Sequence, residues 1–184
     1  WLPERRRDGR LRLLFVGKEW NRKGGQIAVD ALNSLQRRGI DAELTMVGCD
    51  APKEVLNIPH LTVHPYVEDV ASFFTDADVF ILPTRAECAG IVFCEASAYG
   101  LPSFATDTGG VPDYVEDGVN GRLLSISATG EDFADAIAEL WSDQETMDAM
   151  RVSARRRYEE ELNWDVWVQH FERIAQKALT ESKE

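Results

Sequence analysis

Short apolar segments alternate with segments of helical periodicity through the first two thirds of the chain, and this alternation constrains the fold more than any other feature. Three apolar segments, residues 11–16, 42–47 and 78–82, are rich in Leu, Val and Phe. Between the first two, residues 24–38 carry apolar side chains at helical spacing, and Gly39 follows as a stop signal. Strands that are apolar throughout are typical of a parallel sheet buried on both faces. The sequence therefore predicts an α/β fold: a Rossmann-like, doubly wound and mainly parallel sheet with helices on both faces.

The other expected elements are fainter or lie in the last third of the chain. They are strands at residues 61–63, 103–105 and 121–124, and helices at residues 70–74, 91–99, 131–141, 144–161 and 165–179. Because no strand pattern follows residue 130, we expect a helical C-terminal tail. The basic run at residues 151–157 precedes three glutamates, which predicts a solvated, ion-paired helix face.

Composition excludes several classes of function. A length of 184 residues suits one hydrophobic core, and a formal net charge of -12 disfavours a nucleic-acid partner. No apolar run approaches the roughly 18 residues of a membrane span, so we expect no integral membrane contact. The three cysteines, Cys49, Cys88 and Cys94, lack the pairing of a zinc site or a disulfide scaffold and favour a reducing cytoplasm. The chain opens without Met or a signal peptide, so we expect an upstream segment to be missing.

Ligands of a doubly wound sheet bind at the carboxyl ends of its strands, so segments that directly follow the expected strands are candidate sites. The first such segment, residues 17–25, contains Gly17, whose backbone a ligand can approach closely, and Lys18 and Lys23, which are point charges suited to phosphate. The segment matches neither the P-loop nor the G-x-G-x-x-G pattern. Taken alone, an ordinary basic surface loop is the commoner interpretation.

The second candidate segment, residues 83–90, precedes the expected helix at 91–99 and places two carboxylates near its start. Glu87 lies in the loop and Glu95 lies eight residues further on, about a turn and a half into the helix, so both can face one crevice. The helix N-terminus near Gly90 offers free N–H groups to an anion. The simpler alternative is that Glu87 favours the helix dipole and Glu95 is a surface residue. For Glu95 we disfavour it, because the helix is apolar on most sides.

The third candidate segment, residues 106–112, also follows a strand. Gly109 and Gly110 precede a short helix with Pro112 in its first turn, which would form a second cradle of backbone N–H groups. A tight turn explains the same residues equally well on local grounds.

Together, these segments resemble in order and spacing the C-terminal domain of GT-B-fold glycosyltransferases of the retaining class called glycosyl transferases group 1. Glu87 and Glu95 match the E-x7-E signature of that class. Its other motifs are similar to residues 15–18, 23–24, 81–84, 95–102, 108–112, 117–121 and 163–164. The resemblance covers nearly the whole chain.

The resemblance implies a nucleotide-diphosphate sugar as substrate, with no further cofactor and no metal. Lys18 and Lys23 would contact the diphosphate, Glu87 the donor sugar beside the reacting carbon, and Glu95 the ribose. The base would lie near Gly48 and the turn at residues 64–67. The implied catalytic residues are thus Glu87, Lys18 and Lys23, and the implied donor-binding residues are Glu95, Gly17, Gly90, Ile91, Gly109, Gly110, Gly48 and Pro65.

Two departures from the family pattern concern the donor pocket. Lys18 stands where the family usually has Arg, which keeps the charge and loses the bidentate fork. Cys88 replaces a glycine and Ala89 an aromatic residue of the usual motif, so the identity of the sugar stays open. We expect Cys88 to be a small buried residue rather than a nucleophile.

The resemblance also implies a division of the chain and of its function. Residues 1–10 would be an exposed linker from a missing N-terminal domain, residues 11–162 the nucleotide-sugar-binding domain, and residues 163–184 a helix packing toward the missing domain. The whole protein would transfer a hexosyl group to an acceptor hydroxyl on a sugar, lipid or small molecule. Because the acceptor binds mainly to the N-terminal domain, this chain alone would be inactive. A nucleotide-sugar epimerase of GT-B fold and a non-catalytic nucleotide-binding module remain as alternatives.

Overall fold

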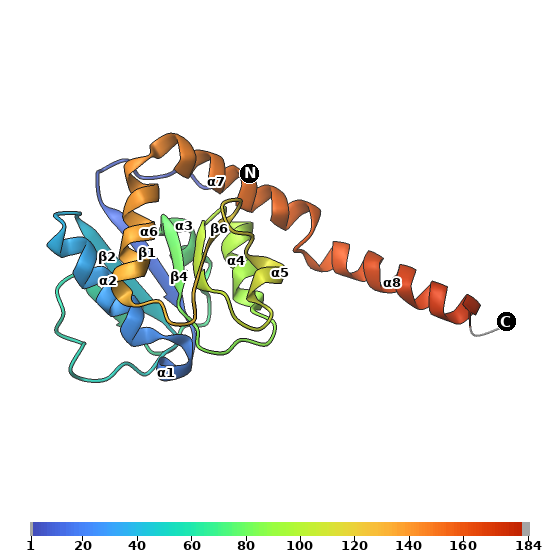
Figure 1. Cartoon of the computed structure of the whole chain (residues 1–184), viewed down its shortest axis with the longest axis horizontal. Helices are drawn as coiled ribbons and strands as arrows, with labels where there is room; N and C mark the ends of the chain where they lie inside the picture. Colours follow the sequence, from blue (N-terminus) through green and yellow to red (C-terminus); the bar gives the residue numbers. More distant parts are fainter. Residues whose placement is uncertain (1, 182–184) are drawn as a thin grey trace.

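Six strands form one sheet, and every neighbouring pair is parallel (Figure 1). They are β1 (Leu11–Val16), β2 (Ala42–Val47), β3 (Leu61–His64), β4 (Val79–Leu82), β5 (Ser103–Thr106) and β6 (Gly121–Leu124). The computed structural model describes residues 2–181. All six expected strands are present, with ends that differ by at most one residue, and the predicted Rossmann-like fold is confirmed. Each apolar run forms a strand because both faces of this sheet are covered.

The strand order β3-β2-β1-β4-β5-β6 reverses direction between β1 and β4. These two strands pair directly, with Leu13 opposite Val79 and Leu14 opposite Phe80. The connections that leave β1 and β4 therefore run in opposite directions and leave a crevice between them at the carboxyl ends of the strands. The fold thus places the loops after β1 and β4 side by side.

The helices follow the predicted pattern with one addition. They are α1 (Trp20–Lys23), α2 (Gly25–Arg37), α3 (Ala71–Asp76), α4 (Ile91–Ala98), α5 (Val111–Tyr114), α6 (Gly130–Ser142), α7 (Gln144–Glu160) and α8 (Trp164–Glu181). The four-residue helix α1 is not predicted by the sequence. It ends at Gly24, whose φ of 76° is left-handed and separates α1 from α2.

The two faces of the sheet are covered by different helices. Helices α2 and α6 pack on each other over one face, while α3 and α4 lie over the other (Figure 1). On the α3 and α4 side, Phe80 of β4 contacts Phe74 of α3 and Phe93 of α4, with ring centroids 6.0 and 5.6 Å apart. All three rings are buried, so α4 is held rigidly beside the crevice.

The basic run on α7 is only partly a solvated face. Arg155, Arg156 and Arg157 each form an ion pair with the glutamate four residues later, as predicted. Arg151 is different: it is 8% exposed, and its Nη2 donates to the Pro3 carbonyl oxygen at 2.7 Å. The prediction of a solvated arginine is therefore wrong for Arg151, because the N-terminal segment covers it.

The N-terminal segment is only in part the exposed linker that we expect, because residues 6–9 are exposed whereas Pro3 and the Arg5 side chain are enclosed. It runs alongside α7 (Figure 1), and Pro3 is buried. The Nε of Arg5 lies 3.0 Å from Oδ1 of Asp78, and these side chains are only 4% and 3% exposed. Asp78 directly precedes β4, so the N-terminal segment is held at the amino ends of the strands, opposite the crevice. Its role as a connection to another domain stays a prediction, and Trp1 lies outside the described residues.

Replacing Arg5 by Met is expected to lower the free energy of unfolding by about 2 kcal/mol at pH 7, the contribution of a hydrogen bond to a charged group. Burial already raises the pKa of Asp78, although the Arg12 N–H and the Arg5 side chain act to lower it. Removing Arg5 raises that pKa further, so the folded variant favours the protonated carboxyl. Stability from a raised carboxyl pKa is present at acidic pH and lost as pH rises.

The difference in free energy of unfolding between Arg5→Met and the wild type should therefore be largest at neutral pH and become smaller in acid. Urea unfolding from pH 7 downward measures it, with Arg6→Met, which removes an exposed ion pair to Asp76, as the control. A deficit that does not change with pH would contradict the role assigned to Asp78.

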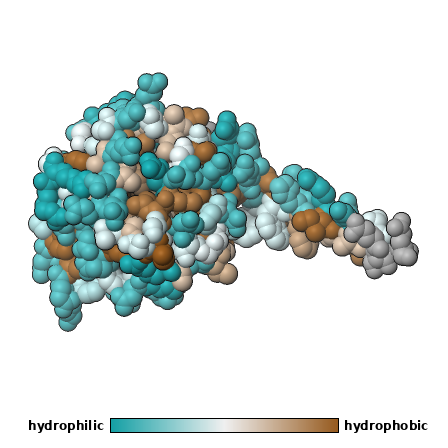
Figure 2. Space-filling model, in the orientation of Figure 1, coloured by the Kyte–Doolittle hydropathy of each residue, from teal (hydrophilic) through white to brown (hydrophobic). Residues whose placement is uncertain are grey.

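Helix α8 projects away from the rest of the molecule (Figure 1). Trp167 and Phe171 are exposed, as predicted. Its other exposed large apolar side chains are Trp164, Val168, Ile174 and Leu179. Apolar residues also appear on the outer part of this helix in Figure 2. That α8 packs toward another domain stays a prediction. Residues 182–184 of the predicted C-terminal helix lie outside the described residues. Within residues 2–181, no helix combines the length and apolar character needed to cross a membrane.

Candidate functional site

The loops after β1 and β4 touch backbone to backbone at the crevice. A Cβ at Gly24 would lie only 2.0 Å from the Pro83 carbonyl oxygen, so no larger residue fits there without a shift of the backbone. The Arg85 N–H donates to the Arg22 carbonyl at 2.7 Å, and Oγ1 of the buried Thr84 donates to the same oxygen at 3.2 Å. These contacts fix how far apart the two loops lie.

One lysine and one glutamate, 64 residues apart in sequence, meet across these loops. The Nζ of Lys23 donates a hydrogen bond to Oε2 of Glu87, and the side chains are only 12% and 9% exposed. The stem of Lys23 runs over Gly17, where a Cβ would lie 3.1 Å from its Cγ. The structure thus brings together Gly17, Lys23 and Glu87, three of the predicted site residues, in one enclosed cluster.

The third candidate loop packs against the second. Gly109 has a left-handed φ of 53°, and a Cβ there would lie 1.9 Å from the Glu87 carbonyl oxygen. A Cβ at Gly110 would lie 2.3 Å from the Cys88 carbonyl oxygen. The Gly110 N–H donates to the Glu87 carbonyl at 3.4 Å. The two glycines therefore hold the backbone of Glu87 in place, and their contact with a diphosphate stays a prediction.

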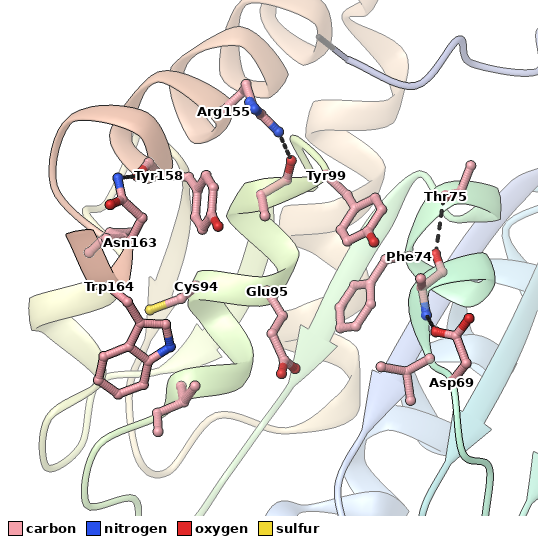
Figure 3. A pocket seen from close by; sticks show the side chains of 15 residues that line it. Asp69, Phe74, Thr75, Cys94, Glu95, Tyr99, Arg155, Tyr158, Asn163 and Trp164 are labelled. Atoms are coloured by element: carbon pink, nitrogen blue, oxygen red, sulfur yellow. Dashed lines mark hydrogen bonds between the residues drawn. The ribbon is translucent and has the colours of Figure 1, made fainter. Parts of the chain in front are cut away.

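Glu95 lies on α4 and lines a pocket of about 700 Å³. Figure 3 shows its carboxylate pointing into the open space between α4 and α3. Gly90, with φ 67°, is the residue that starts α4, and the exposed Ile91 lines the same pocket. Trp164, the first residue of α8, forms another part of the wall. The pocket thus joins the N-terminal end of α4 to α3 and α8.

The Glu95 side chain is exposed, so the sequence argument against a surface position is wrong. Phe93 and Ala96 on the same helix are fully buried, and Glu95 lies on the remaining face. Within residues 2–181, no hydrogen bond or ion pair involves its carboxylate. Desolvation by the pocket walls raises the pKa of Glu95 above its ordinary value. This carboxylate is therefore free to accept hydrogen bonds from a ligand.

The two glutamates of the E-x7-E pattern have different surroundings. Glu87 is paired with Lys23 and is not among the residues that line the pocket of Glu95. The expectation that both face one crevice is thus met only in part: the loop carries one carboxylate into the crevice, while the helix turns the other toward α3 and α8.

The remaining predicted residues lie at the ends of β1, β2 and β3. Gly48 has a left-handed φ of 86°, its N–H donates to the His64 carbonyl at 2.8 Å, and a Cβ there would lie 3.7 Å from the Gly17 carbonyl oxygen. Pro65 and Lys18 are exposed. Gly48 is therefore beside the loop after β1, whereas Lys18 extends into solvent in this structure.

Cys88 is exposed beside Glu87, so the prediction of a small buried residue is wrong. Its carbonyl faces Gly110, which directs the side chain away from the backbone contact. Cys49 is the buried cysteine of the chain, and desolvation raises the pKa of its thiol.

Two residues to which the sequence analysis gives no role help to build the site. Arg22 donates from Nη1 to the Ala86 carbonyl at 3.0 Å and forms an ion pair with Glu19. Thr84 joins the two loops through its hydroxyl, and the N–H of the next residue, Arg85, donates to the same Arg22 carbonyl. The available sequence signal was their place directly before Lys23 and directly after Pro83. Within residues 2–181, no three His, Cys, Asp or Glu side chains are grouped to hold a metal ion.

The sheet with a strand-order switch, the glycine-containing loop after β1 and the enclosed cation and carboxylate at the switch point define a Rossmann-like domain with a site suited to a charged ligand. The chain belongs to the family of glycosyl transferases group 1, whose family model matches residues 10–143. The predicted family resemblance is therefore confirmed.

Curated relatives are about one third identical to this chain over the aligned residues. The chain is 32% identical over 158 residues to a D-inositol 3-phosphate glycosyltransferase of Paenarthrobacter aurescens, covering 78% of the chain and 38% of that protein. It is 33% identical over 161 residues to a GDP-mannose-dependent alpha-(1-6)-phosphatidylinositol monomannoside mannosyltransferase of Mycobacterium tuberculosis, covering 78% of the chain and 42% of that protein. The chain thus spans about two fifths of the length of these relatives.

Solved structures share the fold. The glycosyltransferase WaaG superposes with a TM-score of 0.76 at 24% identity, over 84% of this chain and 44% of its own. Anabaena HepE, solved in complex with UDP and glucose, superposes with a TM-score of 0.76 at 20% identity, over 92% of this chain and 48% of its own.

Proposed function

We propose that this chain is the donor-binding half of a retaining glycosyltransferase that transfers a hexosyl group from a nucleotide-diphosphate sugar to an acceptor hydroxyl. The observation that carries the proposal is the enclosed pair of Lys23 and Glu87 at the switch point between β1 and β4. Relatives whose names specify glycosyl transfer, and a structural neighbour solved with UDP and glucose, support it.

The residues divide the donor between them. Lys23 and Lys18 bind the diphosphate together with the N-terminal end of α4 at Gly90. Glu95 accepts hydrogen bonds from the ribose hydroxyls, which suits a carboxylate with no partner in the described chain. Glu87 holds the hydroxyls of the donor sugar. The base lies near Gly48, Pro65 and the end of β3.

The chemistry is the departure of a nucleoside diphosphate from the sugar. As the bond from the anomeric carbon to the phosphate oxygen breaks, negative charge grows on the diphosphate and positive charge on the sugar. In the donor complex, Lys23 and the helix N–H groups at Gly90 stabilise the first charge. The carboxylate of Glu87 lies on the sugar side of the same cluster, where it orients the reacting carbon. Retention of configuration is part of this proposal and rests on the resemblance to the retaining class.

The acceptor binds to a second domain, N-terminal to this one in the whole protein. The chain covers two fifths of its curated relatives, which leaves room for such a domain. The exposed apolar side chains of α8, such as Trp167 and Phe171, are the surface on which it packs. By itself the chain binds the donor and does not transfer sugar.

Calorimetric titration of the chain with a panel of nucleoside diphosphates and nucleotide sugars tests this function. We expect saturable binding of at least one nucleotide, weakened about tenfold by Glu95→Gln because a hydrogen bond to a charged group is lost. The same samples, incubated with donor and simple alcohols, should form no glycoside.

Glu172→Gln, which removes an exposed carboxylate on α8, is the matched control and should leave the affinity unchanged. Absence of nucleotide binding would refute the donor site. Free epimer as the product of the whole protein would instead identify an epimerase, and binding without any product would identify a non-catalytic module.

A further inference from the structure

The ammonium group of Lys23 is paired with a carboxylate of the chain itself. It donates to Glu87 Oε2, and both side chains are nine-tenths enclosed. Arg22, the cation next to Lys23 in sequence, is paired with Glu19 and donates to the Ala86 carbonyl. The proposed function asks both Lys23 and Glu87 to bind the donor, so their mutual ion pair has to open first.

We propose that Glu87 is an internal competitor for the diphosphate site. Its carboxylate holds Lys23 before the donor binds; the donor diphosphate then draws Lys23 away, which leaves the Glu87 carboxylate to bind the hydroxyls of the donor sugar. This inference rests on the proposed function. It adds that one lysine exchanges a carboxylate for a phosphate, and that sugar binding at Glu87 depends on this exchange.

The two partners differ in freedom, which decides which of them moves. The backbone of Glu87 is held by Gly109 and Gly110, and its carbonyl accepts the Gly110 N–H. Lys23 ends the short helix α1, and its flexible stem lies over Gly17, which has no side chain to confine it. Lys23 therefore swings toward the phosphate while the backbone of Glu87 stays in place.

The exchange distinguishes a nucleotide sugar from a nucleoside diphosphate. Both ligands take Lys23 away from Glu87, but only the nucleotide sugar supplies hydroxyl donors to the released carboxylate. A nucleoside diphosphate leaves an enclosed carboxylate without its partner, which is costly. After the sugar has been transferred, the ion pair re-forms and assists release of the diphosphate product.

Calorimetry with UDP and GDP on the 184-residue chain tests the competition directly. We expect Glu87→Gln to bind the nucleoside diphosphate about tenfold more tightly than the wild type, which corresponds to about 1.4 kcal/mol. In the Lys23→Met background the same Glu87→Gln change should give no gain, because no lysine is left to release. The four proteins form a double-mutant cycle.

A neighbouring carboxylate separates competition from the general effect of removing negative charge. Glu19→Gln removes an exposed carboxylate of the same loop that pairs with Arg22 rather than Lys23, and it should change affinity less than about twofold. Equal affinities of wild type and Glu87→Gln, or an equal gain from Glu19→Gln, would overturn the competition and leave the proposed function standing. If neither nucleotide bound any of the proteins, both would fall. Circular dichroism of each variant establishes that it is folded, and if Lys23→Met does not fold, the Glu19→Gln comparison still decides.

Discussion

Replacing Gly24 by Ala is expected to lower the free energy of unfolding by about 3 to 5 kcal/mol. One part is the left-handed backbone, with φ 76°, which costs an L-residue about 1 to 2 kcal/mol. The larger part is steric, because the new Cβ would lie 2.0 Å from the Pro83 carbonyl oxygen and would push apart the loops after β1 and β4. Urea unfolding followed by circular dichroism measures the change.

Gly39→Ala is the matched control. Gly39 also has a left-handed φ, 79°, but a Cβ there would have no heavy atom within 4 Å. Gly39→Ala should therefore lose only the stability that the left-handed backbone costs, about 1 to 2 kcal/mol. If the two variants lost the same stability, the close approach of the two loops at Gly24 would not be real. Nucleotide affinity should fall only in Gly24→Ala, because only that glycine adjoins Lys23.

Replacing Lys23 by Met in the whole protein is expected to reduce kcat about 100- to 1,000-fold, the effect typical of removing one preorganised donor from a developing negative charge. Under the proposed function, the ammonium stabilises the diphosphate more as it leaves than while it is still bound to the sugar. Steady-state kinetics with varied donor concentration, together with direct measurement of donor affinity, checks both quantities.

Two further variants sharpen this result. Lys53→Met removes an exposed lysine from the segment between β2 and β3 and should leave kcat unchanged. Lys23→Arg keeps the charge and should recover part of the rate. A variant Lys23→Met that changed only the donor KM would show that the lysine binds the donor without taking part in catalysis.

The fold was predictable because its strands are buried on both faces. Segments such as Leu11–Val16 are apolar almost throughout and are bounded by polar residues, so their position follows from hydrophobicity alone. Helix α1 was not predictable in the same way, because four residues contain no helical period. The predicted helix at residues 24–38 included Gly24, because the sequence does not reveal that Gly24 has a left-handed φ.

The site was predictable as a set of loops and not as a set of contacts. Both Lys23 and Glu87 follow expected strands, but their contact depends on β1 lying beside β4. Local hydrophobic periodicity does not predict the order of strands in a sheet. The N-terminal segment shows the same limit. Its arginines have the composition of a linker, while the partner that buries Arg5 lies 73 residues away.

The union of two distant loops at the switch point also determines how a ligand acts on the molecule as a whole. Gly24 and Pro83 lie in the loops after β1 and β4, the two strands at which the halves of the sheet meet through the pairs Leu13–Val79 and Leu14–Phe80. Under the proposed function, a diphosphate bound between these loops contacts both halves of the sheet, so its full binding energy is available only when both halves are assembled. We therefore expect donor binding to stabilise the entire sheet against cooperative unfolding rather than to order one loop.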